Sequence, residues 1–159
     1  MNDLSHIDDS GAARMVDVGD KKPTTRRAEA EAWLEVGEKV MAAIRDQTTP
    51  KGNVFETARL AGILAAKKTS DLIPLCHDLP LDHVAVDFRC EGTRIHIRSS
   101  AATRWSTGVE MEALTAAAVA GLTLYDMLKA LSKTMTFDGL RLLSKSGGRS
   151  GEYRAEEAP

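Results

Sequence analysis

An acidic and a basic residue near the end of a long apolar segment are the first candidates for chemistry. Asp126 and Lys129 are three residues apart, so on a helix their side chains are neighbours, and Lys133 continues the row. A carboxylate beside a lysine keeps the lysine charged for anion binding or orients it for proton transfer. A solvated ion pair near a helix end would have the same spacing, but Asp126 follows three apolar helical turns.

The triplet Leu75-Cys76-His77 is a second candidate, in a loop that contains two prolines. A histidine next to a cysteine suggests a metal ligand or a nucleophile, but no second pair lies at zinc-site spacing. Cys90 falls on the apolar face of an expected strand, where we expect a core residue. A histidine that hydrogen-bonds a ligand is the simpler functional interpretation of His77, and a packed loop histidine is the alternative.

Lysines at the edges of loops and helices form a third group. Lys51 precedes Gly52, Lys67 lies near an expected helix end, and Lys145 opens the glycine-rich residues 145–151. Glycines let backbone amides approach an anion, and lysine supplies a point charge. The stretch lacks the order of a phosphate-binding P-loop, and a mobile C-terminal loop would have a similar composition. Convergence of these lysines in an acidic protein would favour a polyphosphate ligand.

Glu110 and Glu112 lie at the start of the longest expected helix. Glu110 follows Thr107 by three residues, which fits a capping box, whereas the pattern gives Glu112 no structural role. Glu112 and Asp126 are 14 residues apart. On one helix they project similarly but lie about 21 Å apart along the axis. If both are catalytic, we predict a site that is shared between subunits.

Hydrophobic periodicity predicts three helices, over residues 26–46, 53–68 and 107–132. The first has apolar residues at amphipathic spacing, while the other two are apolar on nearly every side. Asn53 is the expected N-cap of the second helix. Helices without a polar face must be buried, either in the core or between subunits.

Alternating apolar residues predict strands over residues 83–90 and 93–100, joined as a hairpin at Glu91-Gly92. Further strands are expected over residues 12–18 and 135–143. The resulting order is the ferredoxin-like βαββαβ arrangement with an inserted helix, an α+β fold with helices packed on an antiparallel sheet. Two nearly apolar helices exceed what one small sheet can cover, which indicates a homo-oligomer.

Length and composition limit the function classes. The 159 residues fit one domain, 1–159, with a polar lead-in at about 1–10 and a flexible tail at about 145–159. A net charge of -2 is unlike a nucleic-acid-binding protein or a polybasic membrane protein. No apolar run is long enough for a membrane span. Two cysteines and an acidic N-terminus without a signal peptide predict a cytoplasmic protein.

Longer strings carry a family resemblance. They are Met15-Val16-Asp17-Val18, Lys51-Gly52-Asn53-Val54-Phe55, Ala65-Ala66-Lys67-Lys68-Thr69, Leu72-Ile73-Pro74-Leu75-Cys76-His77, Gly108-Val109-Glu110-Met111-Glu112-Ala113-Leu114-Thr115-Ala116, Tyr125-Asp126-Met127 and Lys145-Ser146-Gly147-Gly148. From about residue 5 to residue 153 the chain resembles the cyclic pyranopterin monophosphate synthase family, the molybdenum cofactor biosynthesis protein C (MoaC).

The resemblance implies a ferredoxin-like hexamer, built as a trimer of dimers with active sites at dimer interfaces. It also implies a lyase that acts after a radical GTP cyclase. The substrate would be (8S)-3′,8-cyclo-7,8-dihydroguanosine 5′-triphosphate, and the products cyclic pyranopterin monophosphate and pyrophosphate. No cofactor is firmly implied, although Mg²⁺ could accompany the triphosphate.

By position, the resemblance makes Asp126 the active-site aspartate and Lys129 its neighbouring catalytic lysine. Matching substrate-binding and pocket positions are Leu75, Cys76, His77, Met111, Glu112, Arg26, Lys51, Lys67, Glu110 and Lys145. Lys51 and Lys129 are assigned to proton transfer, for which lysines with a lowered pKa are suited, and Asp126 to orienting Lys129. His77 is assigned to substrate contact.

A non-catalytic oligomer that binds a nucleotide or pterin and regulates a partner is the competing interpretation. Such a module would need the basic pocket and His77 but not the pair of Asp126 and Lys129, so the pair favours an enzyme. RNA binding through the sheet would require exposed aromatic residues on central strands, and Phe88 on the apolar face gives poor support.

Overall fold

One antiparallel sheet runs through the protein. The computed structural model describes residues 6–8 and 10–156, so residues 1–5 and 9 of the expected lead-in and residues 157–159 of the expected tail lie outside it. The elements are β1 (Thr24–Glu35), α1 (Gly37–Arg45), α2 (Val54–Ala66), α3 (Thr69–Leu72), β2 (His83–Glu91), β3 (Arg94–Trp105), α4 (Glu110–Leu128), β4 (Thr136–Ser146) and β5 (Tyr153–Arg154). The strand order is β2-β3-β1-β4-β5.

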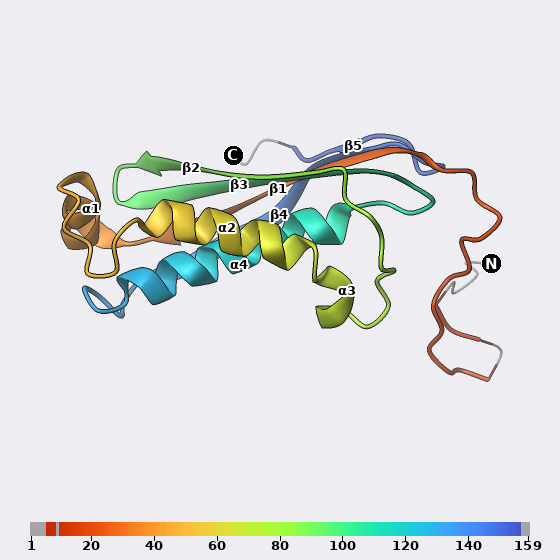
Figure 1. Ribbon diagram of the computed structural model, residues 1–159, viewed down its shortest axis with the longest axis horizontal. Helices are drawn as coiled ribbons and strands as arrows, with labels where there is room; N and C mark the ends of the chain where they lie inside the picture. Colours follow the sequence, from red (N-terminus) through yellow and green to blue (C-terminus); the bar gives the residue numbers. More distant parts are fainter. Residues whose placement is uncertain (1–5, 9, 157–159) are drawn as a thin grey trace.

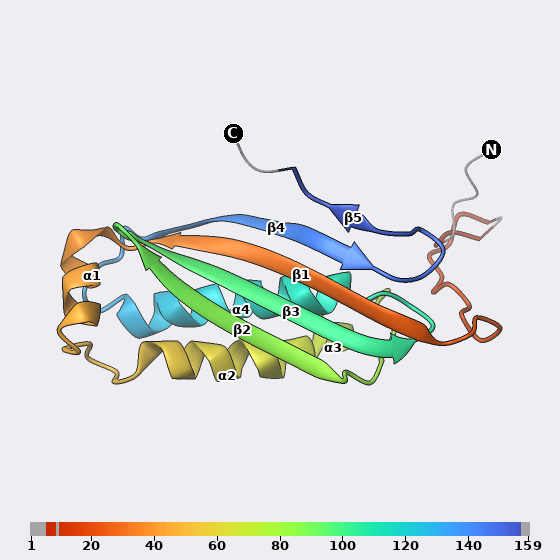
Figure 2. The ribbon, with the colours of Figure 1, turned by 90° about the horizontal axis from the view of Figure 1, so that it is seen from above.

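The helices α2 and α4 lie side by side on one face of this sheet, and α1 lies near one end (Figure 1). The view from above shows the opposite face of the sheet with no helix across it (Figure 2). Strands β1 and β3 are central and antiparallel, β2 pairs with β3, and β4 pairs with β1. This arrangement confirms the expected α+β fold, and the order of its four long strands is that of the ferredoxin-like fold.

The helix expected over residues 26–46 is wrong in its first half, which is the central strand β1. From Ala28 to Leu34, every second residue of this strand is buried on the face toward the helices: Ala28, Ala30, Ala32 and Leu34. The apolar residues of this segment fit a helical period as well as the period of two that is typical of a strand. Alanine and glutamate favour helices, so the sequence pattern predicts a helix here. The helix itself begins at Gly37, whose φ of 76° permits the sharp change of direction after the strand.

The remaining boundaries follow the expectations with a few corrections. No strand forms over residues 12–18, where the segment makes only an isolated bridge between Ile7 and Ala13. The β2–β3 hairpin is confirmed, with its turn one residue later than expected. The expectation that Cys90 is a core residue is wrong, because this residue is exposed near the end of β2. Asn53 caps α2 by accepting a hydrogen bond from the Glu56 amide at 3.1 Å. β4 continues to Ser146, three residues beyond its expected end, because its last residues pair with β1.

Close packing of α2 on α4 depends on Gly62. A Cβ atom at this position would lie 2.8 Å from the Ala116 carbonyl oxygen and 3.2 Å from the Ala120 Cβ. Small residues on both helices therefore let the backbones approach. This contact fixes α4 along the sheet, so that its two ends become the two places where functional side chains gather.

The opposite face of the sheet carries a polar network. Glu31 lies 2.7 Å from His96 Nε2 on β3 and accepts a hydrogen bond of 2.7 Å from Arg141 Nε on β4. Trp33 stacks on the His96 ring with centroids 4.1 Å apart. Burial raises the pKa of Glu31, but hydrogen bonds from Arg141 and His96 outweigh it, so the net shift is downward. The network ties β3, β1 and β4 together where no helix covers them.

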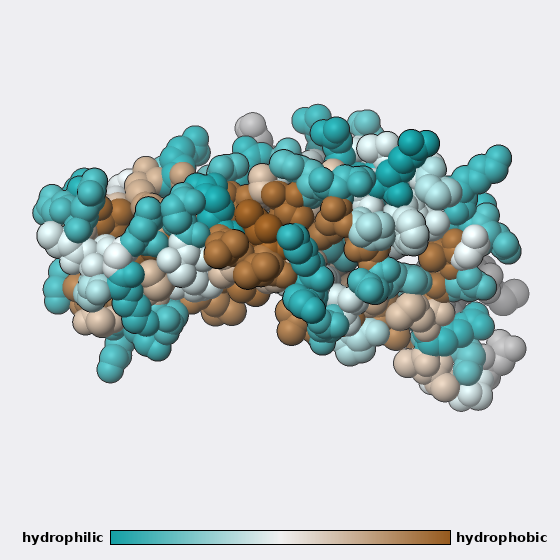
Figure 3. All heavy atoms as spheres, viewed as in Figure 1, coloured by the Kyte–Doolittle hydropathy of each residue, from teal (hydrophilic) through white to brown (hydrophobic). Residues whose placement is uncertain are grey.

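The outer surface of the helical layer is apolar. Leu60 and Leu64 on α2 and Leu122 on α4 are each more than half exposed. Figure 3 shows hydrophobic surface gathered over these helices. By length and composition α4 could cross a membrane, but over half of its most apolar window is buried, as in the core helix of a folded domain. The three exposed leucines are called the leucine patch below.

Candidate active site

Asp126 lies between two lysine ammonium groups in the last turn of α4. Lys129 Nζ lies 2.6 Å from one of its carboxylate oxygens, and Lys51 Nζ lies 2.8 Å from the other. Hydrogen bonds from Lys129 and Lys51 lower the pKa of Asp126 to about 2. The hydrogen bond with Asp126 raises the pKa of Lys129. The expected ion pair is confirmed, but the lowered lysine pKa is wrong for Lys129 in this single chain, because the carboxylate stabilises its charged form.

A tight turn delivers Lys51 to this cluster from 75 residues away. The Gly52 amide donates to the Thr49 carbonyl at 3.2 Å, and the Thr49 hydroxyl donates to the Gly52 carbonyl at 2.6 Å. Gly52 has a φ of 81°, which favours glycine at this position. Asn53 then starts α2, so the turn and the cap together hold Lys51 against the end of α4.

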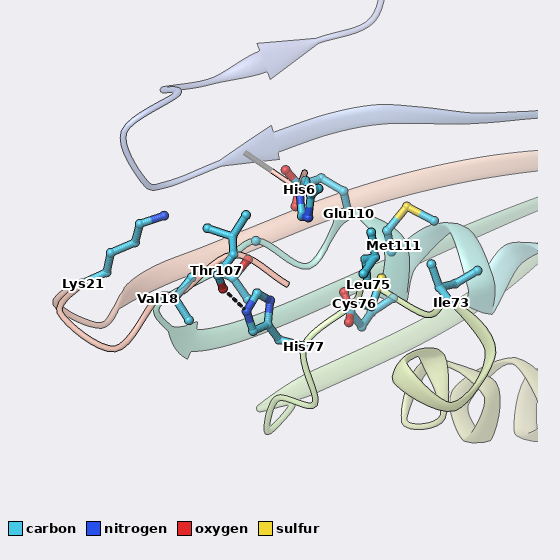
Figure 4. Close-up of a pocket in the computed structure, with 13 residues that line it drawn as sticks. His6, Val18, Lys21, Ile73, Leu75, Cys76, His77, Thr107, Glu110 and Met111 are labelled. Atoms are coloured by element: carbon cyan, nitrogen blue, oxygen red, sulfur yellow. Dashed lines mark hydrogen bonds between the residues drawn. The ribbon is translucent and has the colours of Figure 1, made fainter. Parts of the chain in front are cut away.

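An open pocket of about 640 Å³ lies at the other end of α4 (Figure 4). Three segments surround it: the N-terminal segment before β1, the loop after α3, and the start of α4. Its lining residues are His6, Val16, Val18, Lys21, Ile73, Leu75, Cys76, His77, Thr107, Gly108, Glu110, Met111 and Glu112. One side of the pocket is apolar, and histidines, a lysine and two carboxylates supply its polar groups.

Glu112 is the most perturbed acid of this pocket. Its residue is 4% exposed, and burial raises the pKa of its carboxyl group to about 7. Burial and the charge of Glu112 also raise the pKa of the Cys76 thiol, which disfavours a thiolate nucleophile. His77 Nε2 lies 2.7 Å from the Val16 carbonyl oxygen. Because a carbonyl only accepts, Nε2 must carry the hydrogen, and Nδ1 is the acceptor of the neutral ring.

Basic side chains gather beside this pocket, near Glu110. Lys145 Nζ lies 3.0 Å from the Glu110 carboxylate and donates to the Ser150 hydroxyl at 2.8 Å. The expected capping box is therefore wrong: Val109 is the N-cap of α4 and makes no side-chain cap, while Glu110 pairs with Lys145. Arg26 Nη2 donates to the Ser106 carbonyl at 3.3 Å. A Cβ atom on Gly148 would overlap the Arg26 guanidinium, so this glycine makes room for the arginine.

Comparison with known proteins shows the family to which this chain belongs. Residues 15–148, most of the chain, match the MoaC family. The chain belongs to the MoaC family. It is 54% identical to the cyclic pyranopterin monophosphate synthase of Novosphingobium aromaticivorans over 157 residues, which cover 99% of this chain and 100% of that protein. The synthase of Desulfatibacillum aliphaticivorans is 53% identical, covering 96% of this chain and 98% of that protein.

This MoaC chain separates the expected site residues into two groups. Leu75, Cys76, His77, Glu110, Met111 and Glu112 line the pocket, with Arg26 and Lys145 beside it. Asp126, Lys129 and Lys51 form the cluster at the opposite end of α4. Lys67 is the C-cap of α2 and is exposed, and within residues 6–8 and 10–156 no hydrogen bond or ion pair joins it to either group. The expectation that one chain keeps Glu112 and Asp126 apart is thus confirmed.

Sequence reasoning missed the contribution of the N-terminal segment. Val16, Val18 and Lys21 line the pocket, but the sequence patterns do not place this segment at the site. The apolar valines next to Asp17 were interpreted as a strand. The polar, turn-rich sequence around these valines was a signal that they do not form a strand. Apolar residues outside a sheet must pack on another part of the chain, and here they pack at the pocket.

Within residues 6–8 and 10–156, no three histidine, cysteine or carboxylate side chains gather closely enough to hold a metal ion. Cys76 and His77 have no third ligand in this range.

Proposed function

We propose that this chain is a cyclic pyranopterin monophosphate synthase of molybdenum cofactor biosynthesis. It would convert (8S)-3′,8-cyclo-7,8-dihydroguanosine 5′-triphosphate to cyclic pyranopterin monophosphate and release pyrophosphate, as a lyase. The observation that carries the proposal is the Asp126 carboxylate between Lys129 and Lys51, in a chain about half identical to named synthases over nearly its whole length. The names of the relatives give no support to a non-catalytic regulatory module.

The two lysines suit the proton transfers of a ring rearrangement. Opening and closing the purine-derived ring requires a group that donates a proton and a group that accepts one. Asp126 holds Lys129 and Lys51 within 2.6 and 2.8 Å of its carboxylate oxygens, which fixes the direction of both ammonium groups. We assign Lys51 and Lys129 to proton transfer and Asp126 to their orientation.

The pocket at the other end of α4 suits the substrate's body and phosphates. The triphosphate requires several cations, and Arg26, Lys145 and Lys21 lie in or beside this pocket. With Nε2 on the Val16 carbonyl, the other ring nitrogen of His77, Nδ1, is left for a contact with the substrate, and Glu112 in its protonated form can donate a hydrogen bond. Lys67 would contribute a further positive charge for the triphosphate. Any Mg²⁺ would arrive with the triphosphate, where it would neutralise phosphate charge.

The two groups can meet only if a second copy supplies one of them. Glu112 and Asp126 lie about 21 Å apart along α4, too far for one small substrate to contact both within a single chain. A homo-oligomer with sites between subunits, such as a hexamer built as a trimer of dimers, resolves this separation. The leucine patch gives an apolar surface for such contacts. The substrate would come from a radical GTP cyclase, in the cytoplasm.

Turnover of the cyclised GTP derivative tests this function directly. The purified protein should form cyclic pyranopterin monophosphate and pyrophosphate in equal amounts. Asp126→Ala and Lys129→Ala variants that keep their far-ultraviolet circular dichroism should form neither product. Tight binding of the substrate without either product would contradict the synthase and support the regulatory module.

A further inference from the structure

The N-terminal segment that lines the pocket is held by few contacts. In the described part of the chain, two hydrogen bonds join residues 15–21 to elements outside the N-terminal segment. One links the Val16 carbonyl to His77, and the other links the Lys21 carbonyl to the Ser106 hydroxyl at 2.9 Å. The other bonds of this segment are internal, such as the Gly19 amide to Asp17 at 2.8 Å. Loss of either external bond should therefore loosen this wall of the pocket.

Ser106 is the residue where this wall meets the basic side chains. Its hydroxyl donates to the backbone carbonyl of Lys21, while its own backbone carbonyl accepts from Arg26 Nη2 at 3.3 Å. Among the described residues, the Arg26 Nε atom is buried and has no hydrogen-bond partner. The orientation of the guanidinium thus depends on Ser106 and on the space left by Gly148. One residue between β3 and α4 therefore holds the backbone of Lys21, which lines the pocket, and contacts the guanidinium of Arg26, which flanks it.

We propose that Ser106 is a positioning residue for substrate binding. Its hydroxyl anchors the backbone of the N-terminal segment at Lys21. This anchor keeps Val16 against His77 and keeps the Lys21 side chain on the side of the pocket near Arg26, where both cations can receive the anionic phosphates of the substrate. The inference rests on the proposed function, and it adds a residue that the sequence reasoning did not single out. Ser106 lies at the pocket end of α4, away from Asp126 and Lys129, so it should affect substrate binding more than the proton transfers.

Two isosteric substitutions isolate the hydroxyl group. Ser106→Thr keeps the donor, and Ser106→Val has the same shape without it. Because one net hydrogen bond is lost, we expect KM for the cyclised GTP derivative to rise about 3- to 10-fold in Ser106→Val, with kcat within about twofold of wild type. Ser106→Thr should stay close to the wild-type KM. Ser100→Ala, on the outer face of β3, is the matched control and should change neither constant.

Limited trypsin digestion gives a readout that does not depend on activity. Arg14 and Lys21 are exposed cleavage positions in the N-terminal segment, so the intact Ser106→Val protein should be cut there faster than Ser106→Thr. Unchanged KM and unchanged cleavage would overturn the inference, as would a fall in kcat at unchanged KM. If wild type forms no product, the proposed function fails, whereas the digestion still tests whether Ser106 holds the segment.

Discussion

Glu112 and Asp126 are acids of the same helix, 14 residues apart, whose environments shift their pKa values in opposite directions. Burial raises the pKa of Glu112 to about 7, whereas hydrogen bonds from Lys129 and Lys51 lower that of Asp126 to about 2. At neutral pH one carboxyl group is therefore partly protonated and the other is fully ionised. Two acids held in different states by their surroundings can take different roles in one reaction.

Asp126→Asn should abolish most of the turnover. The amide keeps the shape of the carboxylate but removes the charge that orients both lysines, so we expect kcat to fall by about 100-fold or more. The pKa of Lys129 should fall as well, because its anionic partner is gone. Steady-state kinetics of product formation and the pH titration of Lys129 by NMR measure the two effects.

The control for Asp126→Asn is Glu56→Gln, which removes the acid of the exposed Arg59–Glu56 pair, also at i,i+3 spacing. This variant should keep the wild-type kcat, because the pair lies on the surface of α2. If Asp126→Asn retained more than half of the wild-type turnover, Asp126 would be only a surface ion-pair partner and its catalytic assignment would be wrong.

Glu112→Gln should change how folding stability depends on pH. The pKa of Glu112 is about 4.5 in the unfolded chain and about 7 in the folded one, so the folded state binds more protons between these values. Wild-type stability should therefore fall as pH rises from about 4.5 to 7 and then level off, by about 3 kcal/mol from this group. Glutamine removes the titration, so the variant should be more stable than wild type at pH 8.

Urea denaturation of wild type and Glu112→Gln at pH 5 and pH 8 measures this difference. The free energy of unfolding of the two proteins should be similar at pH 5 and diverge at pH 8. A difference that does not depend on pH would show that Glu112 does not titrate in this window, and it would remove the carboxyl group from consideration as a neutral hydrogen-bond donor.

The fold class could be predicted because four elements have clear patterns of apolar residues. Alternation gave β2 and β3, and continuous apolar runs gave α2 and α4. The strand β1 was misassigned because Ala-Glu alternation has high helix propensity, and only pairing with β3 and β4 makes it a strand. Local preference cannot predict an element that is stabilised by residues far away in the chain.

Only the local contacts among the candidate site residues could be predicted from the sequence. Asp126 and Lys129 could be paired from helical spacing, since the pair is local. The contact of Lys51 with Asp126 crosses 75 residues and depends on how the turn before α2 meets the end of α4. Likewise, the pairing of Glu110 with Lys145 required knowing that β4 ends beside the start of α4. Nothing in the local sequence contains these distances.

The leucine patch should be necessary for assembly. Leu64→Glu or Leu122→Glu places a charge on a surface that a second subunit would cover, and burying an unpaired charge is costly. We expect sedimentation velocity to show smaller species than in wild type, together with loss of turnover. Leu140→Glu, at an exposed leucine of β4, is the control and should leave the size unchanged. If Leu64→Glu and Leu122→Glu keep the wild-type size, the patch is not the interface.

Mixing two inactive variants should restore activity if the site lies between subunits. His77→Ala disables the pocket, and Asp126→Asn disables the lysine cluster at the other end of α4. In a mixed dimer, one of the two shared sites takes its pocket from one chain and its cluster from the other, both intact. Random mixing by co-expression should therefore recover about a quarter of the wild-type sites, since half of the dimers are mixed. If each site lay within a single chain, the mixture would stay as inactive as its components, because no chain would carry both intact groups.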